Sequence, residues 1–441
     1  MVIARFMLRA GFKVRTFILN LNQQFSSDFE VNRKRLEEMP KAEIEVWNDF
    51  PEEFPVFAEK TIMVDAIFGS GLSRELKSWP AKIIKQLNEL PYIKVAIDIP
   101  SGLFADKALE AKIPIAFRAD YTLSFQFPKL AFLFPENDAF VGHWKILDIG
   151  LSSAYIQQTE TAHYFLNKAF VRSLIKRREK FSHKGDYGHL LMIAGDHTKM
   201  GAALLSSKAA LRAGASLVSL HHPKNSALYL SAVPEIMSSP DENEACFSQV
   251  PPLDKYSQIA IGPGLGLHKK TINAFKILIQ QAQSPLVIDA DALNILAENK
   301  TWLNFLPKAS VLTPHIGELR RLIGNSNNSF HQLEKTKAFA KKYQLYVLIK
   351  GAHSAVCTPN GQVFFNSTGN PGMASGGSGD VLTGIIAALM AQHYSSLDAA
   401  IIGMYLHGLS GDLALEKNSV QSLIASDIVD YLGLAEKYLS S

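Results

Sequence analysis

The most chemically suggestive segment of the chain is the run SGGSGD at residues 375–380, directly before a long apolar stretch. Glycines let a backbone approach a ligand closely, and unpaired N–H groups at the start of a helix bind anions. We expect a helix to begin near Asp380, with the helix dipole keeping its carboxylate ionised. This pattern is typical of phosphoryl transfer, in which Asp380 would deprotonate an attacking hydroxyl. Taken alone, it also fits an aspartate that only caps a helix.

Four other polar clusters each follow a short apolar run with strand character. They are GPGLG at residues 262–266, DADALN at 289–294, TPHIGE at 313–318 and KGAHS at 350–354. Open α/β sheets bind ligands at the carboxyl ends of their strands, so we expect these clusters to lie near Asp380. Their number and context favour a shared ligand site over unrelated turns.

Short β-rich runs alternate with helical stretches along the chain, which predicts an α/β fold with parallel sheets. The expected helices are 2–10, 202–213, 270–281 and 381–392. The expected strands are 14–19, 61–68, 94–99, 121–125, 143–148, 188–194, 216–220, 258–261, 286–289, 310–313 and 346–350, and 355–359 with 363–366 as a hairpin. The pattern stops near Gly150, and the polar segment that follows, with a basic helical stretch at 170–180, predicts a boundary.

The length and composition limit the classes of function that fit this chain. A chain of 441 residues is long enough for two or three domains, and a net charge of +4 without a basic stripe argues against dedicated nucleic-acid binding. The two cysteines, Cys246 and Cys357, are too few for a disulfide framework, and no apolar run approaches the roughly 20 residues of a membrane span. We therefore expect a cytoplasmic enzyme and a homo-oligomer, with no nucleic-acid or membrane partner. The Arg-rich start also fits a transit peptide, but its apolar stripe favours a helix.

Residues 184 to about 434 resemble the NAD(P)H-hydrate dehydratase family, a branch of the ribokinase-like superfamily. Besides the four clusters, the matching motifs are KGDYGHLLMIAGD (184–196), MGAALL (200–205), LRAGASLV (211–218), PEIM (234–237) and NPGMASGGSGDVLTG (370–384). The resemblance implies a three-layer ribokinase-like domain that repairs NADHX and NADPHX, which carry a hydroxyl on the reduced nicotinamide ring. ADP or ATP with Mg²⁺ would phosphorylate that hydroxyl, and expulsion of phosphate would restore the cofactor.

The resemblance also assigns site residues in this domain. Asp380 would be the catalytic base. The anion hole would comprise Gly376, Gly377, Ser378 and Gly379. The nucleotide would be held by Lys350, Gly351, Ala352, His353, Ser354 and Gly379. The hydrate would be bound by Gly201, Ala202, Gly266, His315 and Asp380. Two roles fit Glu318 and Asp289 equally well. One is contact with the substrate or with Mg²⁺-bound water, and the other is structural hydrogen bonding.

Residues 1–151 resemble the NAD(P)H-hydrate epimerase domain, which has a Rossmann-like three-layer fold. The matching motifs are VIAR (2–5), VDAIFGSGLSREL (64–76), VAIDIPSGLFAD (95–106), ADYTLSFQFPK (119–129) and VGHWKILDIGL (141–151). The resemblance implies that Asp65 and Ser101 bind K⁺, for which oxygen donors are suited. The hydrate would contact Gly69, Ser70, Gly71, Leu72, Ser73, Arg74, Glu75 and Asp98, with Asp98 assisting the interconversion of the R and S forms. The expected domains are thus 1–151 and 181–441, joined by a linker and helix at 152–180.

The first domain departs from its family at its start. Family members have further helices, a first strand and an Asn-Asn-Gly-Gly-Asp-Gly loop before VIAR, and that loop supplies a K⁺-binding Asn and phosphate-binding N–H groups. The sequence begins within the following helix, so we expect an incomplete site with weak or no epimerase activity. A misassigned start codon and a decayed gene both explain the departure.

Two other functions fit parts of the sequence. The run GGSGD also occurs in ribokinase-like kinases of vitamin alcohols, of the hydroxymethylpyrimidine, thiazole or pyridoxal type. The first domain alone also fits a scaffold or an RNA-binding module, although the weak net charge and the lack of interleaved aromatic and basic residues count against RNA. The choice between ADP and ATP stays open.

Overall fold

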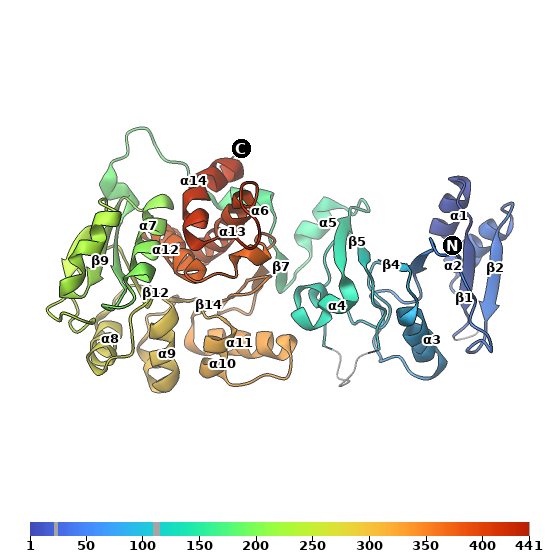
Figure 1. The fold of residues 1–441 in the computed structure, drawn as a ribbon, viewed down its shortest axis with the longest axis horizontal. Helices are drawn as coiled ribbons and strands as arrows, with labels where there is room; N and C mark the ends of the chain where they lie inside the picture. Colours follow the sequence, from blue (N-terminus) through green and yellow to red (C-terminus); the bar gives the residue numbers. More distant parts are fainter. Residues whose placement is uncertain (22–24, 109–114, 441) are drawn as a thin grey trace. The chain divides into compact units, whose positions relative to one another are not determined.

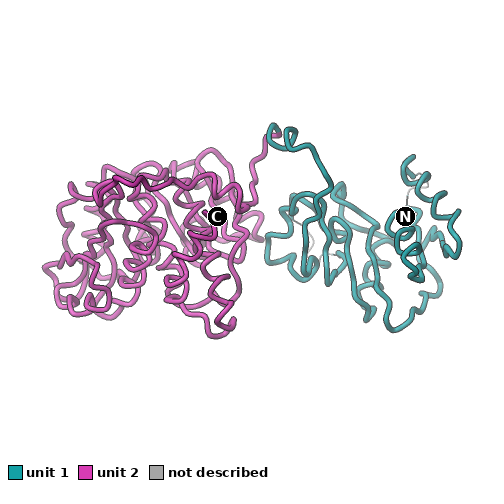
Figure 2. Tube along the Cα trace, turned by 90° about the horizontal axis from the view of Figure 1, so that it is seen from above, with its two compact units in different colours: residues 1–158 teal, residues 159–441 magenta. Residues whose placement is uncertain are grey.

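The computed structural model describes residues 1–21, 25–108 and 115–440, which form two compact units, residues 1–158 and 159–441 (Figure 2). Both units combine helices with largely parallel sheets, which confirms the predicted α/β class. None of the helices in the described ranges is long and apolar enough to cross a bilayer.

The first unit contains two separate parallel sheets. β1 pairs with β2, and the second sheet has the order β3-β4-β5-β6. The strands β1 to β6 are Arg15–Leu19, Glu43–Trp47, Ile62–Asp65, Ile93–Ile97, Tyr121–Phe125 and His143–Leu147. The helices α1 to α5 are Val2–Arg9, Ser27–Glu37, Ser78–Glu89, Asp138–Val141 and Ser153–Gln158, with 3-10 turns at Leu130–Leu133 and Pro135–Asn137.

The second unit is built on one ten-stranded sheet of order β10-β9-β8-β11-β12-β13-β14-β15-β16-β7. The pairs β14–β15 and β15–β16 are antiparallel, which confirms the predicted hairpin, and the other pairs are parallel. The strands β7 to β16 are His163–Phe165, His189–Ile193, Leu217–His222, Met237–Pro240, Gln258–Ile261, Leu286–Ile288, Val311–Leu312, Tyr346–Ile349, Ala355–Cys357 and Val363–Phe365.

Helices cover both faces of this sheet, as the three layers in Figure 1 show. α7, α12, α13 and α14 lie on one face and α8 to α11 on the other. The helices α6 to α14 are Lys168–Leu174, Met200–Arg212, Lys269–Gln281, Ala290–Glu298, Ile316–Ile323, Ser329–Tyr343, Ser378–Ala391, Ser396–Ala414 and Ala425–Ser440. The 3-10 segments are Lys184–Tyr187, Lys224–Ala232, Lys300–Phe305 and Pro371–Met373.

Of residues 152–180, expected to be a linker with a helix at 170–180, residues 153–158 form α5 in the first unit, and residues 159–180 belong to the second unit. β7 extends the sheet beside β16, and Val171 of α6 is fully buried in its core. The helix ends at Leu174 because Ile175 adopts an extended backbone, after which the Lys176 amide donates to the Tyr394 hydroxyl at 2.9 Å. Basic side chains along this stretch donate to carbonyl groups at the ends of other elements, so they anchor the chain to the second unit rather than form a free helix.

α12 is buried on nearly all sides because it lies between the sheet and α7, α13 and α14. Its apolar sequence suits such a position. A Cβ at Gly384 would lie only 2.0 Å from the carbonyl oxygen of Ser206 in α7, so glycine is needed for the two helices to approach this closely. This contact fixes the placement of α12, whose first turn carries Asp380.

We predict that Gly384→Ala destabilises the second unit by about 1–3 kcal/mol, the usual cost of overpacking a core. Thermal and urea unfolding, followed by circular dichroism, measure the loss. Gly433→Ala is the matched control, because Gly433 is exposed within α14 and a Cβ there meets no atom within 4 Å. Replacing a helical glycine at such a position should stabilise by about 0.5–1 kcal/mol. Equal stability of the two variants would contradict the close approach of α7 and α12.

Candidate functional site

The polar clusters singled out in the sequence meet at the carboxyl ends of the central strands. The Gly195 amide donates to Pro263 O at 2.8 Å, and the Asp289 amide donates to Ile261 O at 3.0 Å. The two segments that follow β13 and β14 also touch, since the Lys350 amide donates to Pro314 O at 3.0 Å. The expected edge of the sheet therefore gathers GPGLG, DADALN, TPHIGE and KGAHS.

The glycine-rich run lies at the start of α12, where Ser378 is the first helical residue and Gly377 is left-handed with φ of 90°. A Cβ on Gly377 would lie 2.6 Å from Cδ1 of Leu205, so this turn needs glycine. Within the described ranges, no protein acceptor is found for the backbone N–H groups of Gly376, Gly377, Gly379 and Asp380. The Ser378 N–H is different, because it makes a long 3.4 Å contact with Ser375 O. The first turn thus presents several free donors, as an anion site requires.

The ammonium group of Lys350 lies directly beside this turn. Its Nζ is 2.7 Å from Oδ1 of Asp289 and 3.1 Å from the position that a Cβ on Gly379 would take. The other carboxylate oxygen of Asp289 accepts a hydrogen bond of 2.6 Å from the Thr383 hydroxyl, one turn after Asp380. Asp289 therefore ties the ends of β12 and β14 to the first turns of α12.

The pKa of Asp380 is raised to about 7, chiefly because burial disfavours its charged form. The negative charges of Asp289, Asp291 and Glu318 raise it further, and the positive charge of Lys350 opposes them. Burial and the neighbouring carboxylates thus act against the expected effect of the helix dipole, which favours the ionised form. A carboxylate with a pKa close to neutral is better suited to accept a proton than a fully acidic one.

His315 and Glu318 form a capping box at the start of α10. Nδ1 of His315 accepts from the Gly317 amide at 2.9 Å, and Oε2 of Glu318 accepts from the His315 amide at 2.9 Å. Burial raises the pKa of Glu318, and Lys350 partly offsets this effect. Because Glu318 and Asp289 both have protein partners, the geometry favours the structural alternative for these two carboxylates. The His315 ring remains half exposed beside the site.

The residues expected to bind the hydrate lie on two neighbouring segments. Gly201 and Ala202 belong to the first turn of α7, and the GPGLG loop packs against this turn. The Gly266 amide donates to Oδ2 of Asp291 at 2.8 Å, and the same oxygen accepts from Lys199 Nζ at 3.2 Å. Lys199 was not identified from the sequence, yet it links the start of α7 to DADALN.

The predicted nucleotide residues form the turn between β14 and β15. The Ser354 hydroxyl donates to Gly351 O at 3.0 Å, and Nδ1 of His353 lies 3.2 Å from Asn366 O. Gly351 and Ala352 are exposed. The structure therefore brings this turn, through Lys350, next to Gly379, while its outer face stays open.

In the first unit, Asp65, the last residue of β3, lies beside Ser101 in the loop that follows β4. The carboxylate of Asp65 accepts from the Ser101 hydroxyl at 2.6 Å, from the Ser101 amide at 2.7 Å and from the Ile67 amide at 3.2 Å. Both residues are buried, and burial raises the pKa of Asp65 to about 6. Among the described residues, no group of three His, Cys, Asp or Glu side chains is arranged to hold a metal ion.

Asp98 directly follows the last residue of β4 and has φ of 67°, which is unusual for a residue other than glycine. Its Oδ1 is 2.8 Å from Lys129 Nζ and accepts from the Phe125 amide at 3.2 Å. The expected hydrate segment from Gly69 to Glu75 is largely exposed, and its Ser73 carbonyl accepts from Lys107 Nζ at 3.2 Å. No hydrogen bond between described residues joins Asp98 to this segment, so the structure places them only in the same unit.

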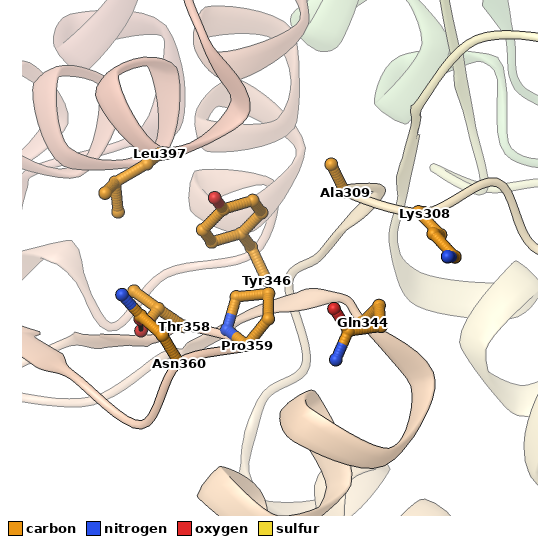
Figure 3. A pocket seen from close by; sticks show the side chains of 8 residues that line it. All are labelled: Lys308, Ala309, Gln344, Tyr346, Thr358, Pro359, Asn360 and Leu397. Atoms are coloured by element: carbon orange, nitrogen blue, oxygen red, sulfur yellow. Dashed lines mark hydrogen bonds between the residues drawn. The ribbon is translucent and has the colours of Figure 1, made fainter.

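A pocket at the opposite edge of the second unit's sheet is not part of this site (Figure 3). Ala309 and Gln344 precede β13 and β14, and the remaining lining residues include the turn between β15 and β16. The pocket therefore opens at the amino ends of these strands, away from Asp380.

Comparison with known families assigns a different family model to each of the two units. The model of the NAD(P)H-hydrate dehydratase family matches residues 190–433, and the model of the YjeF-related protein N-terminus matches residues 1–131. The bifunctional NAD(P)H-hydrate repair enzyme of Moorella thermoacetica is 34% identical over 98% of this chain and 84% of the relative. The enzyme of the same name from Escherichia coli is 34% identical over 84% of this chain and 70% of the relative.

Solved structures resemble the second unit. The ADP/ATP-dependent NAD(P)H-hydrate dehydratase of Bacillus subtilis, co-crystallised with ATP and Mg²⁺, is 29% identical with a TM-score of 0.53, covering 63% of this chain and 98% of that one. A ribokinase-like superfamily protein of Enterococcus faecalis is 27% identical with a TM-score of 0.56, covering 64% and 99%. These findings confirm the predicted resemblance: the chain belongs to the family of bifunctional NAD(P)H-hydrate repair enzymes.

Proposed function

We propose that the second unit dehydrates the S form of NADHX and NADPHX with ADP or ATP as phosphoryl donor. The observation that carries this proposal is the Asp380 carboxylate beside unpaired N–H groups and the Lys350 ammonium at the start of α12. A base, an anion hole and a cation at one point are what phosphoryl transfer to a hydroxyl requires. Membership of the repair family supports the substrate, and the Bacillus subtilis relative supports the nucleotide.

In the first step, the ring hydroxyl attacks the terminal phosphorus of the nucleotide. Asp380 takes the hydroxyl proton as the new P–O bond forms and the bond to the leaving nucleotide breaks. The N–H groups of Gly376, Gly377 and Gly379 and the ammonium of Lys350 stabilise the charge on the transferring phosphoryl group. The turn from Lys350 to Ser354 holds the nucleotide.

In the second step, phosphate leaves with both electrons of its bond to the ring carbon. The lone pair of the ring nitrogen drives this departure, and the adjacent ring carbon then loses a proton to restore the double bond. Phosphorylation is needed because hydroxide is a poor leaving group. Gly201, Ala202, Gly266 and His315 line the space for the ring beside Asp380.

Mg²⁺ bound to the nucleotide phosphates would neutralise part of their charge in this site. It commonly keeps several water ligands and binds through few protein carboxylates. Both oxygens of Asp289 already have partners in Lys350 and Thr383, so this carboxylate is poorly suited to direct coordination. The phosphates and water would therefore provide most of the ligands of such an ion.

For the first unit, we propose that Asp65 and Ser101 contribute oxygen ligands to K⁺, and that Asp98 assists interconversion of the R and S hydrates. The fit to K⁺ rests on two buried oxygen donors only 2.6 Å apart and on the raised pKa of Asp65, which has no cationic side chain among its influences. A bound cation would supply the positive charge that keeps this carboxylate ionised.

The activity is tested with enzymatically prepared NADHX, with ADP and with ATP in parallel. We expect NADH absorbance to return together with release of one phosphate for each NADH formed. Hydroxymethylpyrimidine, thiazole and pyridoxal alcohols serve as alternative acceptors in the same assay. Phosphorylation of a vitamin alcohol without turnover of NADHX would refute the proposal.

We predict that kcat/KM for NADHX falls as the pH drops below about 7. The base must be ionised to accept a proton, and kcat/KM reports the free enzyme, in which the pKa of Asp380 is about 7. Asp380→Asn should lower kcat by about 10²–10⁴-fold and remove this acidic limb from the residual rate. Asp430→Asn is the control, because Asp430 is exposed and only pairs with Lys208 on the surface. A flat profile from pH 5 to 8 in the wild type would contradict the role of Asp380.

We predict that KCl raises the unfolding temperature of the first unit relative to choline chloride at equal ionic strength. The increase should disappear in Asp65→Asn and shrink in Ser101→Ala, because each change removes an oxygen donor. Asp106→Asn, an exposed residue of the same unit, should respond like the wild type. Differential scanning calorimetry measures the shift, and an equal response of wild type and Asp65→Asn to KCl would exclude the site.

A further inference from the structure

His407, on α13, contacts the start of α12 from the side opposite to the unpaired N–H groups. Its Nε2 lies 2.9 Å from the carbonyl oxygen of Ser378 and 3.2 Å from the hydroxyl of the same residue. A carbonyl oxygen can only accept, so Nε2 carries the hydrogen and donates it. Burial lowers the pKa of His407 to about 4, so the ring is neutral at physiological pH and keeps this one donor.

The contact matters because the Ser378 carbonyl and the Gly379 N–H belong to the same planar peptide group. Restraining the carbonyl therefore also restrains the direction of the N–H on the other side of the plane. The N–H groups in the first turn of a helix have no helical partner, so nothing within α12 holds them from the donor side. A hydrogen bond to the carbonyl also polarises the peptide group and strengthens its N–H as a donor.

The neighbouring peptide group, Gly379–Asp380, has no comparable side-chain donor at its carbonyl. The Thr383 hydroxyl lies 3.1 Å from Gly379 O, but its single hydrogen is directed to Asp289, which is charged and closer at 2.6 Å. His407 is therefore the clearest side-chain donor to a carbonyl in the first turn of α12.

α13 is itself held in register by hydrogen bonds on both sides of His407. Thr368 donates through its hydroxyl to Tyr405 O at 2.9 Å, and Asp412 accepts from the Gly369 amide and from the Asn370 side chain, each at 2.9 Å. Gly408 permits this approach, since a Cβ there would lie 2.3 Å from Oγ1 of Thr368. The imidazole is thus presented to Ser378 by a rigid support.

We infer that His407 is a positioning residue of the anion hole, whose Nε2–H orients the Ser378–Gly379 peptide so that the Gly379 N–H faces the transferring phosphoryl group. This inference rests on the proposed function of the second unit. His407 touches no reacting atom and moves no proton. It acts only through the peptide group that it holds.

The inference is tested by comparing His407→Gln, His407→Asn and His407→Leu. The amide nitrogen of glutamine can occupy the place of Nε2, whereas that of asparagine corresponds to Nδ1 and leucine has no donor. We expect His407→Gln to keep most of kcat. His407→Asn and His407→Leu should lower kcat by roughly 10–100-fold, less than the 10²–10³-fold typical of deleting an oxyanion-hole donor. KM for NADHX and ATP and the midpoint of the pH profile should stay unchanged.

His189→Leu is the matched control, because it also removes a part-buried histidine whose Nε2 contacts a serine hydroxyl, that of Ser219 at 2.9 Å. His189 begins β8, at the amino end of the strand, and its loss should leave kcat unchanged. Thermal unfolding is measured for every variant. If leucine prevents folding, the pair of glutamine and asparagine variants decides the question at similar stability.

A second measurement separates this inference from the proposed function. The Gly379 amide resonance, assigned in protein labelled with ¹⁵N-glycine by its absence in Gly379→Ala, should shift upfield in His407→Leu and remain near its wild-type position in His407→Gln. An inactive wild type would refute the proposed function alone, and the amide shift would still test the contact. Full kcat in His407→Leu, or equal losses in the folded glutamine and asparagine variants, would overturn the inference.

Discussion

The arrangement of the second unit depends on one buried carboxylate. Asp289 binds Lys350 through one oxygen and Thr383 through the other, and its side chain is 1% exposed. Since α12 follows the sheet's last hairpin in the chain, these two bonds join segments distant in sequence into one edge. Removing one partner of a buried ion pair commonly costs about 3–5 kcal/mol, because the other charge stays buried without compensation. The cost of an uncompensated charge therefore maintains the geometry around Asp380.

The same arrangement explains why the base of the site has a pKa near neutral. Asp289, Asp291, Glu318 and Asp380 share a region in which Lys350 is the cation that most stabilises Asp380. Because Lys350 is committed to Asp289, its charge only partly offsets the burial of Asp380. A local argument from the helix dipole overlooks this balance, since each of the opposing carboxylates comes from another segment of the chain. Burial and the convergence of these carboxylates in the folded chain thus give Asp380 a pKa suited to a proton acceptor.

Much of the fold could be predicted because apolar strands followed by polar clusters are local patterns, and so DADALN and TPHIGE indicated the correct edge of the sheet. β2, β7 and β10 were missed: EIEVW contains two glutamates, HYF is very short and MSSP is polar, and each becomes a strand only by pairing with another strand. The roles of Thr383 and His407 were missed for the same reason, because their partners Asp289 and Ser378 lie 94 and 29 residues away in the sequence. Sequence motifs indicated which residues form the site, whereas the interactions that position those residues are seen only in the three-dimensional structure.

The close contact of α7 with α12 couples the two halves of the site. Gly201 and Ala202 lie in the first turn of α7, Asp380 in that of α12, and Gly377 packs against Leu205 of α7. Both helices start at the same edge of the sheet, and Gly384 sets their separation further along. A shift of α7 would therefore move the proposed pocket for the hydrate and the anion hole together. Such coupling preserves the distance between an attacking hydroxyl and its base, to which the rate of phosphoryl transfer is most sensitive.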